Sequence, residues 1–179
     1  MSKNRKRKSR RTRQKVQVFF AGRDESVIIP SKIIENMGFD VYANFEEENM
    51  VINPHETKLI PTGLYSAVEV GYGFILKERG STGTKGMGQR SGVIDSGYRG
   101  EWFVPITNLN DKPIVITKET NEETLEVLKE DYIVYPYSKA ITQAILVPVP
   151  KVQVNKISVE ELQAIPSVRG TGALGSSKK

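Results

Sequence analysis

The stretch "SGVIDSGYRGEW", residues 91–102, places Asp95 and Tyr98 on either side of a glycine, with further glycines close to both ends. A β-branched run enters Asp-Ser-Gly and the chain leaves through an aromatic residue, a pattern typical of a β-hairpin with a tight turn. The stretch therefore predicts a carboxylate at the tip of a hairpin. In a lone hairpin that carboxylate would simply cap backbone amides, so a chemical role for Asp95 depends on what accompanies it.

Short runs of β-branched and aromatic residues surround this hairpin, separated by Gly, Pro and Asn. Clear examples are "KLIPTGLYSAVEV" at 58–70, "YGFILKE" at 72–78, "EWFVPITNL" at 101–109 and "KPIVITK" at 112–118. Runs of this length, with little helical periodicity, predict an all-β fold, a distorted jelly-roll β-barrel or sandwich. The longer run "AITQAILVPVPKVQV", residues 140–154, contains two prolines and is expected to be an edge strand or a segment that leaves the body.

One or two short helices complete the expected fold. Thr120 with Glu123, and Ser158 with Glu161, each have the spacing of a capping box at the start of a helix. Apolar residues follow each box, so both segments are expected to be amphipathic.

The positive charge of the chain is concentrated at its N-terminus. Residues 1–15 hold nine Lys or Arg and no acid, and removing those nine charges from the net +5 leaves the rest of the chain at −4. We interpret this segment as a disordered basic tail, which either solubilises the protein or contacts nucleic acid weakly. A single domain is expected over residues 16–165, with a flexible C-terminal arm over residues 166–179.

Composition narrows the cellular setting. The chain has no Cys, which excludes a disulfide framework or a thiolate metal site, and it has no apolar run of the roughly 18 residues that span a bilayer. These features predict a cytoplasmic protein without membrane contact.

Two glycine-rich segments headed by arginine could bind anions. "KERGSTGTKGMG", residues 77–88, contains small residues whose backbone amides can approach a phosphate and two cations, Arg79 and Lys85, that supply charge. Arg169 precedes "GTGALGSS". Each segment alone is equally well explained as a surface loop or a tail. Together with the hairpin they suggest a triphosphate held beside a flat ring, and a carboxylate that activates water. His55 is isolated in "NPHET" and is expected to be an exposed loop residue.

Five segments, taken in order, resemble the five motifs of the trimeric dUTPase family. They are "MGFDVYA" at 37–43, "ERGSTG" at 78–83, "GVIDSGYRGE" at 92–101, "AITQAILVPV" at 140–149 and "RGTGALGSS" at 169–177. The resemblance implies a jelly-roll chain that assembles as a homotrimer and hydrolyses dUTP to dUMP and pyrophosphate with Mg²⁺. Such an enzyme keeps uracil out of DNA and supplies dUMP for thymidylate synthesis.

The resemblance also implies roles for residues of the third motif. Asp95 is expected to be the general base for a water that attacks the α-phosphorus, and it is ionised at neutral pH at an ordinary pKa of about 3.9. Tyr98 would pack against the deoxyribose. The backbone from Gly92 through Val93 to Ile94 would pair with the uracil edge.

The other motifs imply contacts to the phosphates and the metal. Asp40 is expected to bind Mg²⁺ through water, and Gln143 to lie near the α-phosphate. The remaining substrate-binding positions implied by the resemblance, from the second, third and fifth motifs, are Arg79, Gly80, Ser81, Gln89, Arg169, Gly172, Leu174 and Ser176. Each site would be assembled from three subunits.

Several positions depart from the family pattern. The second motif reads Arg-Gly-Ser in place of Arg-Ser-Gly, Gln89 stands for a usual Asn, Ala140 for a usual Arg, and Leu174 for a usual Phe. An insertion of about twenty residues around 117–136 has no assigned role.

Two alternatives remain beside this hypothesis. A dCTP deaminase shares the fold, and Glu101 directly after the hairpin would suit that chemistry. A nucleotide- or DNA-binding regulatory protein on the same scaffold is the other, suggested by the altered motifs and the basic tail.

Overall fold

A computed structural model describes residues 15–90 and 92–172 of the chain. It divides into two compact units, residues 1–149 and 150–179. The strands are β1 (Val18–Gly22), β2 (Phe39–Val41), β3 (Asn49–Ile52), β4 (Thr57–Pro61), β5 (Leu64–Val68), β6 (Tyr72–Lys77), β7 (Met87–Gln89), β8 (Val93–Asp95), β9 (Phe103–Asn108), β10 (Ile114–Thr117), β11 (Ile133–Pro136) and β12 (Thr142–Pro148). The helices are α1 (Gly80–Gly83), α2 (Glu122–Asp131) and α3 (Val159–Ala164).

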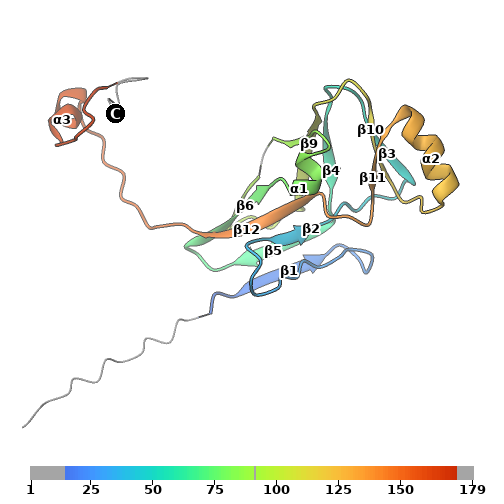
Figure 1. Ribbon diagram of the computed structural model, residues 1–179. Coiled ribbons are helices and arrows are strands. Elements are labelled where there is room, and N and C mark those ends of the chain that lie inside the picture. The colour runs from blue at the N-terminus through green and yellow to red at the C-terminus, as the bar shows by residue number, and fades with distance from the viewer. Residues whose placement is uncertain (1–14, 91, 173–179) are drawn as a thin grey trace, which may run out of the picture. The chain divides into compact units, whose positions relative to one another are not determined.

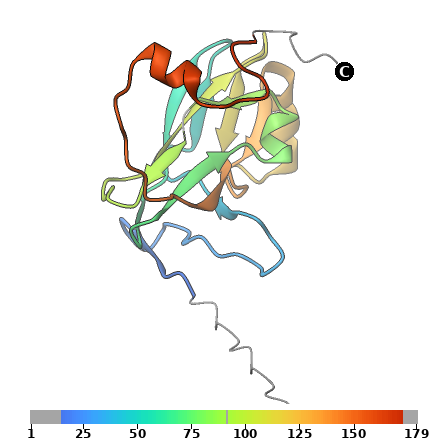
Figure 2. The same cartoon turned by 90° about the vertical axis from the view of Figure 1, so that its left-hand side faces the viewer.

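The strands of the first unit form four small sheets, in the orders β1-β5, β11-β10-β3, β2-β12-β6-β8 and β4-β9-β7. Every described pair is antiparallel except β10 with β11, in which Ile114 lies opposite Ile133. Parallel neighbours need a crossover connection, and α2 provides it. The helix lies against this sheet in both views of the ribbon (Figures 1 and 2).

One apolar core serves all four sheets. Every strand from β2 to β12 contributes a buried residue to it, and Phe20 of β1 packs against it. Trp102, Tyr135 and Phe74 are its largest fully buried side chains. The all-β architecture predicted from the short β-branched runs is therefore confirmed.

The four-stranded sheet determines where the site lies. β12 pairs with β2 on one side and β6 on the other, so it is a central strand, and the expectation of an edge strand is wrong. The reason is that Pro148 ends the ladder and Pro150 lies beyond it, so neither proline interrupts a backbone bond inside the sheet. The first unit ends directly after this strand, at Val149.

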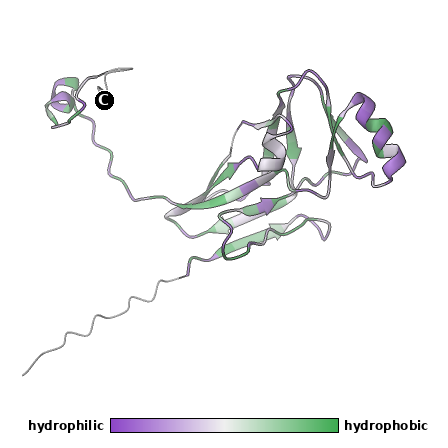
Figure 3. Cartoon of the chain, in the orientation of Figure 1, coloured by the Kyte–Doolittle hydropathy of each residue, from purple (hydrophilic) through white to green (hydrophobic). Residues whose placement is uncertain are grey.

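The helices differ in detail from the sequence expectations. The cap of α2 is Asn121 and not Thr120, because the Asn121 side chain accepts the Thr124 N–H at 3.1 Å. None of the residues of α2 is buried, and Figure 3 shows hydrophilic and hydrophobic residues side by side along it. In the second unit, Ser158 and Glu161 exchange both bonds of the predicted capping box at the start of α3.

The tight turn after β8 is present, since the Tyr98 N–H donates to the Asp95 carbonyl at 3.1 Å. The flanking strands nevertheless do not pair with one another as a hairpin. β8 pairs with β6, and β9 pairs with β4 and β7. In the described part of the chain, no helix has the length and apolarity to cross a membrane.

Candidate functional site

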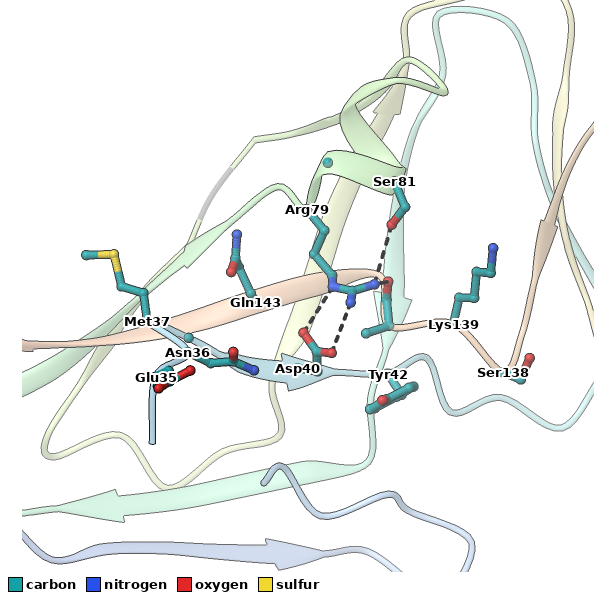
Figure 4. A pocket seen from close by; sticks show the side chains of 13 residues that line it. Glu35, Asn36, Met37, Asp40, Tyr42, Arg79, Ser81, Ser138, Lys139 and Gln143 are labelled. Atoms are coloured by element: carbon teal, nitrogen blue, oxygen red, sulfur yellow. Dashed lines mark hydrogen bonds and ion pairs between the residues drawn. The ribbon is translucent and has the colours of Figure 1, made fainter. Parts of the chain in front are cut away.

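A pocket of about 780 Å³ opens where the loop before β2, the start of α1 and the turn before β12 converge. Figure 4 shows the side chains that line it. Five of the residues predicted for the site lie here although they are far apart in the sequence: Asp40, Arg79, Gly80, Ser81 and Gln143. The structure thus brings the first, second and fourth motifs to one space.

An ion pair lies at the centre of this pocket. The Arg79 guanidinium contacts both carboxylate oxygens of Asp40, with Nε to Oδ1 at 3.0 Å and Nη2 to Oδ2 at 3.0 Å. The remaining nitrogen, Nη1, lies 3.4 Å from the Ser81 hydroxyl and 3.4 Å from the Ala140 carbonyl. A paired fork of this kind fixes the orientation of the guanidinium. The contacts engage four of its five N–H groups, so one Nη2 N–H remains for a ligand.

The helix α1 was predicted only as a glycine-rich loop. Thr82 is buried, and its hydroxyl accepts the Arg79 N–H at 3.0 Å, which starts the helical turn at Arg79. The Ser81 hydroxyl projects into the pocket, 3.4 Å from the Tyr135 hydroxyl. The Arg-Gly-Ser order therefore still brings a hydroxyl beside the guanidinium.

Gln143 belongs to the same wall as Asp40, which lies directly opposite it in the sheet. Its amide donates to the Glu78 carbonyl at 3.0 Å, and this bond orients the side chain. A Cβ at Gly38 would lie 3.1 Å from the Gln143 Oε1, so the glycine of the first motif leaves room for the glutamine. The pKa of Glu78 is lowered by a hydrogen bond from its own backbone N–H and by neighbouring Lys77.

Lys139 is a pocket residue that the sequence motifs did not identify. It is exposed at the pocket mouth, and among the described residues its ammonium group has no hydrogen-bond or ion-pair partner. It lies beyond the Arg79–Asp40 pair, on the side opposite Met37 (Figure 4). Since Arg79 is already paired with Asp40, Lys139 is the unpaired cation of this pocket within the described chain.

The third-motif residues lie elsewhere in the first unit. Asp95 is exposed at the end of β8, an edge strand, and Tyr98 is 43% exposed, with its hydroxyl donating to the Glu101 carbonyl at 2.9 Å. In the sheet register, Asp95 lies three strands away from Asp40 and is displaced by four residues along β6. With standard sheet dimensions, the two residues are therefore about 19 Å apart. The chain therefore presents two separate half-sites, one at each edge of the sheet.

Close backbone packing explains the glycine that opens the third motif. A Cβ at Gly92 would lie 2.8 Å from the Leu76 carbonyl oxygen and 2.8 Å from the Gln89 amide nitrogen. The Leu76 N–H donates to the Gly92 carbonyl at 2.7 Å, which holds the segment leading to Val93 and Ile94 against β6.

Gln89 connects strands and does not line the described pocket. Its side-chain oxygen accepts the Thr142 hydroxyl at 2.6 Å. Glu101, the residue that suggested deaminase chemistry, accepts the Gly63 N–H at 2.8 Å and so has a structural role between two loops.

The fifth-motif residues belong to the second unit. Arg169 and Gly172 close a small turn in which the Arg169 Nε donates to the Gly172 carbonyl at 3.1 Å. Arg169 is exposed and Gly172 is half-buried. Leu174 and Ser176 lie outside the described residues.

Comparison with known proteins places these half-sites in a family context. A family model described as dUTPase matches residues 24–121. The deoxyuridine 5'-triphosphate nucleotidohydrolase of Nautilia profundicola is 33% identical over 160 residues, covering 87% of this chain and 94% of the relative. The corresponding protein of Wolbachia pipientis is 29% identical over 171 residues, covering 93% of this chain and 97% of the relative.

Solved structures share the fold. A dUTPase of Staphylococcus bacteriophage 80alpha, solved with dUpNHpp, superposes with a TM-score of 0.68 at 20% identity and covers 91% of this chain and 99% of its own. The EIAV dUTPase superposes with a TM-score of 0.59 at 20% identity, covering 80% of this chain and 98% of its own.

Proposed function

This chain belongs to the dUTPase family, and on that premise we propose that it hydrolyses dUTP to dUMP and pyrophosphate. The observation that carries the proposal is the convergence of Asp40, Arg79, Ser81 and Gln143 on one pocket. Guanidinium, hydroxyl and amide donors around one space are the groups that bind a phosphate chain.

The phosphates lie in this pocket in the proposed complex. Arg79, oriented by Asp40, offers its remaining N–H to a phosphate oxygen, and Ser81 adds a hydroxyl donor. Gln143 is held close to the position of the α-phosphate by its bond to the Glu78 carbonyl. Arg169, from the fifth motif, would add positive charge at the outer phosphates.

The pocket also suits Mg²⁺ that arrives with the triphosphate. The Asp40 side chain is 40% exposed, and its oxygens retain lone pairs that can accept hydrogen bonds from the waters of a hydrated ion. When bound, Mg²⁺ would neutralise part of the phosphate charge.

Asp95 acts as the general base in this mechanism. Its carboxylate takes a proton from a water whose oxygen bonds to the α-phosphorus, and the bond from that phosphorus to the bridging oxygen breaks to release pyrophosphate. The exposed position of Asp95 supports this role, because its carboxylate is accessible to the attacking water.

The outer edge of β8 would recognise the base. Within the described chain only β6 pairs with β8, so the outward backbone groups of Val93 are available to a uracil edge. A fixed pattern of backbone donors and acceptors rejects a base with the wrong pattern by up to about 10⁴–10⁵. Tyr98, held by its bond to the Glu101 carbonyl, would close the ribose side against a 2′-hydroxyl.

We propose that a homotrimer joins the two half-sites. About 19 Å separates Asp95 from Asp40 in one chain, so one triphosphate cannot contact both residues there at bonding distance. Between them the outer sheet face carries neighbouring apolar side chains, with Ile75 40% and Val93 74% exposed. Burial of such a surface by another subunit is favourable.

Two finer points accompany this function. Residues 1–15 would contact nucleic acid weakly through their nine cations, and the enzyme would work in the cytoplasm, where its nucleotide substrate is made.

Product analysis across four nucleotides tests the proposal. With Mg²⁺, we expect pyrophosphate release from dUTP and at least about a hundredfold less from dCTP and UTP, because the backbone pattern rejects cytosine and Tyr98 excludes a 2′-hydroxyl. Release from dTTP should also be lower than from dUTP. Ammonia released from dCTP would instead assign the chain to the deaminases, and binding of dUTP without turnover would indicate a regulatory protein.

Lys139 gives a second prediction. Lys139→Ala should raise KM for dUTP about tenfold with kcat nearly unchanged, because it removes a charge that contacts the phosphates in ground and transition states alike. Steady-state kinetics measure both constants, and Lys139→Arg should restore the KM. An unchanged KM in Lys139→Ala would remove this residue from the phosphate site.

A further inference from the structure

A second pocket of about 510 Å³ lies between α2, the end of β10 and the turn that follows β11. We propose that this second pocket binds an organic phosphate, a nucleotide or a compound of similar size with a multiply charged head and an apolar body. The proposal concerns a ligand other than dUTP and does not depend on the function proposed above, although Lys139 lines both pockets.

Four lysines line the second pocket, and they come from four different elements. Lys85 follows α1, Lys118 follows β10, Lys129 ends α2 and Lys139 lies in the turn before β12. Like charges repel one another, so their convergence from separate parts of the chain costs free energy unless an anion offsets it.

The acid that lines this pocket does not neutralise them. Glu119 is the single carboxylate among its lining residues, and its Oε1 accepts the backbone N–H groups of Thr120 and Asn121, each at 2.7 Å. That carboxylate is thereby directed to the start of α2. The pocket keeps an excess of positive charge.

Two of the four ammonium groups are available to a ligand. Lys118 donates to the Glu46 carbonyl at 2.8 Å and lies over the Tyr137 ring, and Lys129 is paired with Glu126. Lys85 and Lys139 have no such partner among the described residues.

The backbone at both available lysines is fixed. The Asn110 amide donates to the Lys85 carbonyl at 2.9 Å, and the Lys139 N–H donates to the Pro136 carbonyl at 3.0 Å. Two cations on anchored backbone form a preorganised site for a charged head, since less conformational freedom is lost on binding.

Apolar side chains provide the rest of the lining, from Leu125 of α2 and from Val134, Pro136 and Tyr137 on and after β11. Because none of the residues of α2 is buried, the helix leaves this apolar surface uncovered by its own packing. A cavity of this size with an apolar wall and a few charged groups is typical of small-molecule sites. An apolar wall beside lysine ammonium groups suits a nucleotide better than a bare inorganic anion.

ATP binding to the full chain, measured by calorimetry at low salt, tests the proposal. We expect Lys85→Glu to weaken ATP binding at least about tenfold, because it reverses a charge at the head-group position. Lys151→Glu, the same change at an exposed lysine of the second unit, should leave it unchanged. Arg79→Ala, which alters only the dUTP pocket, should also retain ATP binding.

Three results would overturn the proposal: no ATP binding, binding unaffected by Lys85→Glu, or binding lost equally in Arg79→Ala. Adenosine and inorganic pyrophosphate separate the two parts of the ligand, and each should bind more weakly than ATP. Pyrophosphate that bound as tightly as ATP would contradict an organic ligand. Turnover of dUTP is not read in these titrations, so the two proposals fail independently.

Discussion

Replacement of Asp95 by Asn should lower pyrophosphate release from dUTP by about 10²–10⁴-fold, the usual contribution of a positioned general base. Asparagine has the shape of aspartate but cannot take a proton from the attacking water. Asp95 is exposed at a sheet edge, and no described side chain depends on its carboxylate, so the fold should be unaffected. Single-turnover release of pyrophosphate measures the chemical step directly.

Substrate binding separates this loss from a structural one. The Asp95→Asn protein should bind dUpNHpp with nearly the wild-type dissociation constant, because asparagine keeps the shape of aspartate and the phosphate contacts come from Arg79, Ser81 and Gln143. Asp111→Asn, at an exposed aspartate near His55, is the matched control and should turn over normally. Turnover of Asp95→Asn at the wild-type rate would show that another group activates the water.

Mixed trimers provide the second large effect. Arg79→Ala and Asp95→Asn chains should each be inactive alone, yet an equal mixture, unfolded and reassembled together, should regain about a quarter of the wild-type sites. If one subunit supplies Arg79 and another supplies Asp95, each contribution is intact with a chance of about one half in random assembly. Pyrophosphate release per chain measures the recovered fraction.

A mixture of wild-type chains with the Arg79→Ala, Asp95→Asn double variant is the matched control. It should also give about a quarter of the sites active when the two residues come from different subunits, but about one half when both come from the same chain. No recovery in the first mixture, together with one half in the second, would contradict a shared site. A protein that remains monomeric would do so as well.

The elements that were predicted correctly are those with a local sequence signal. The β-branched runs became strands, and the Ser158–Glu161 pair became a helix cap, because both patterns act over a few residues. The centre of α1 was not predicted, since Gly80 and Gly83 disfavour helix, and the turn is stabilised by the buried Thr82. The cap of α2 moved by one residue because Asn121 competes with Thr120 for that role.

The site residues also divide into those with a local sequence signal, which were predicted, and those without one, which were missed. Motif resemblance identified Asp40, Arg79 and Gln143 one by one, and the pairing of β2, β12 and β6 explains why they meet. Lys118, Lys129 and Lys139 were missed, because a single lysine has no distinctive sequence context. Only long-range strand pairing reveals that such residues converge.

The central position of β12 has a consequence for synthesis on the ribosome. This strand is the last of the first unit to be made, yet it lies between β2 and β6, both of which emerge much earlier. Until residue 148 leaves the exit tunnel, these two early strands have unpaired backbone edges and cannot close the core. The nascent chain is therefore vulnerable to misassembly for a time during synthesis. This vulnerable period ends when β12 inserts between β2 and β6.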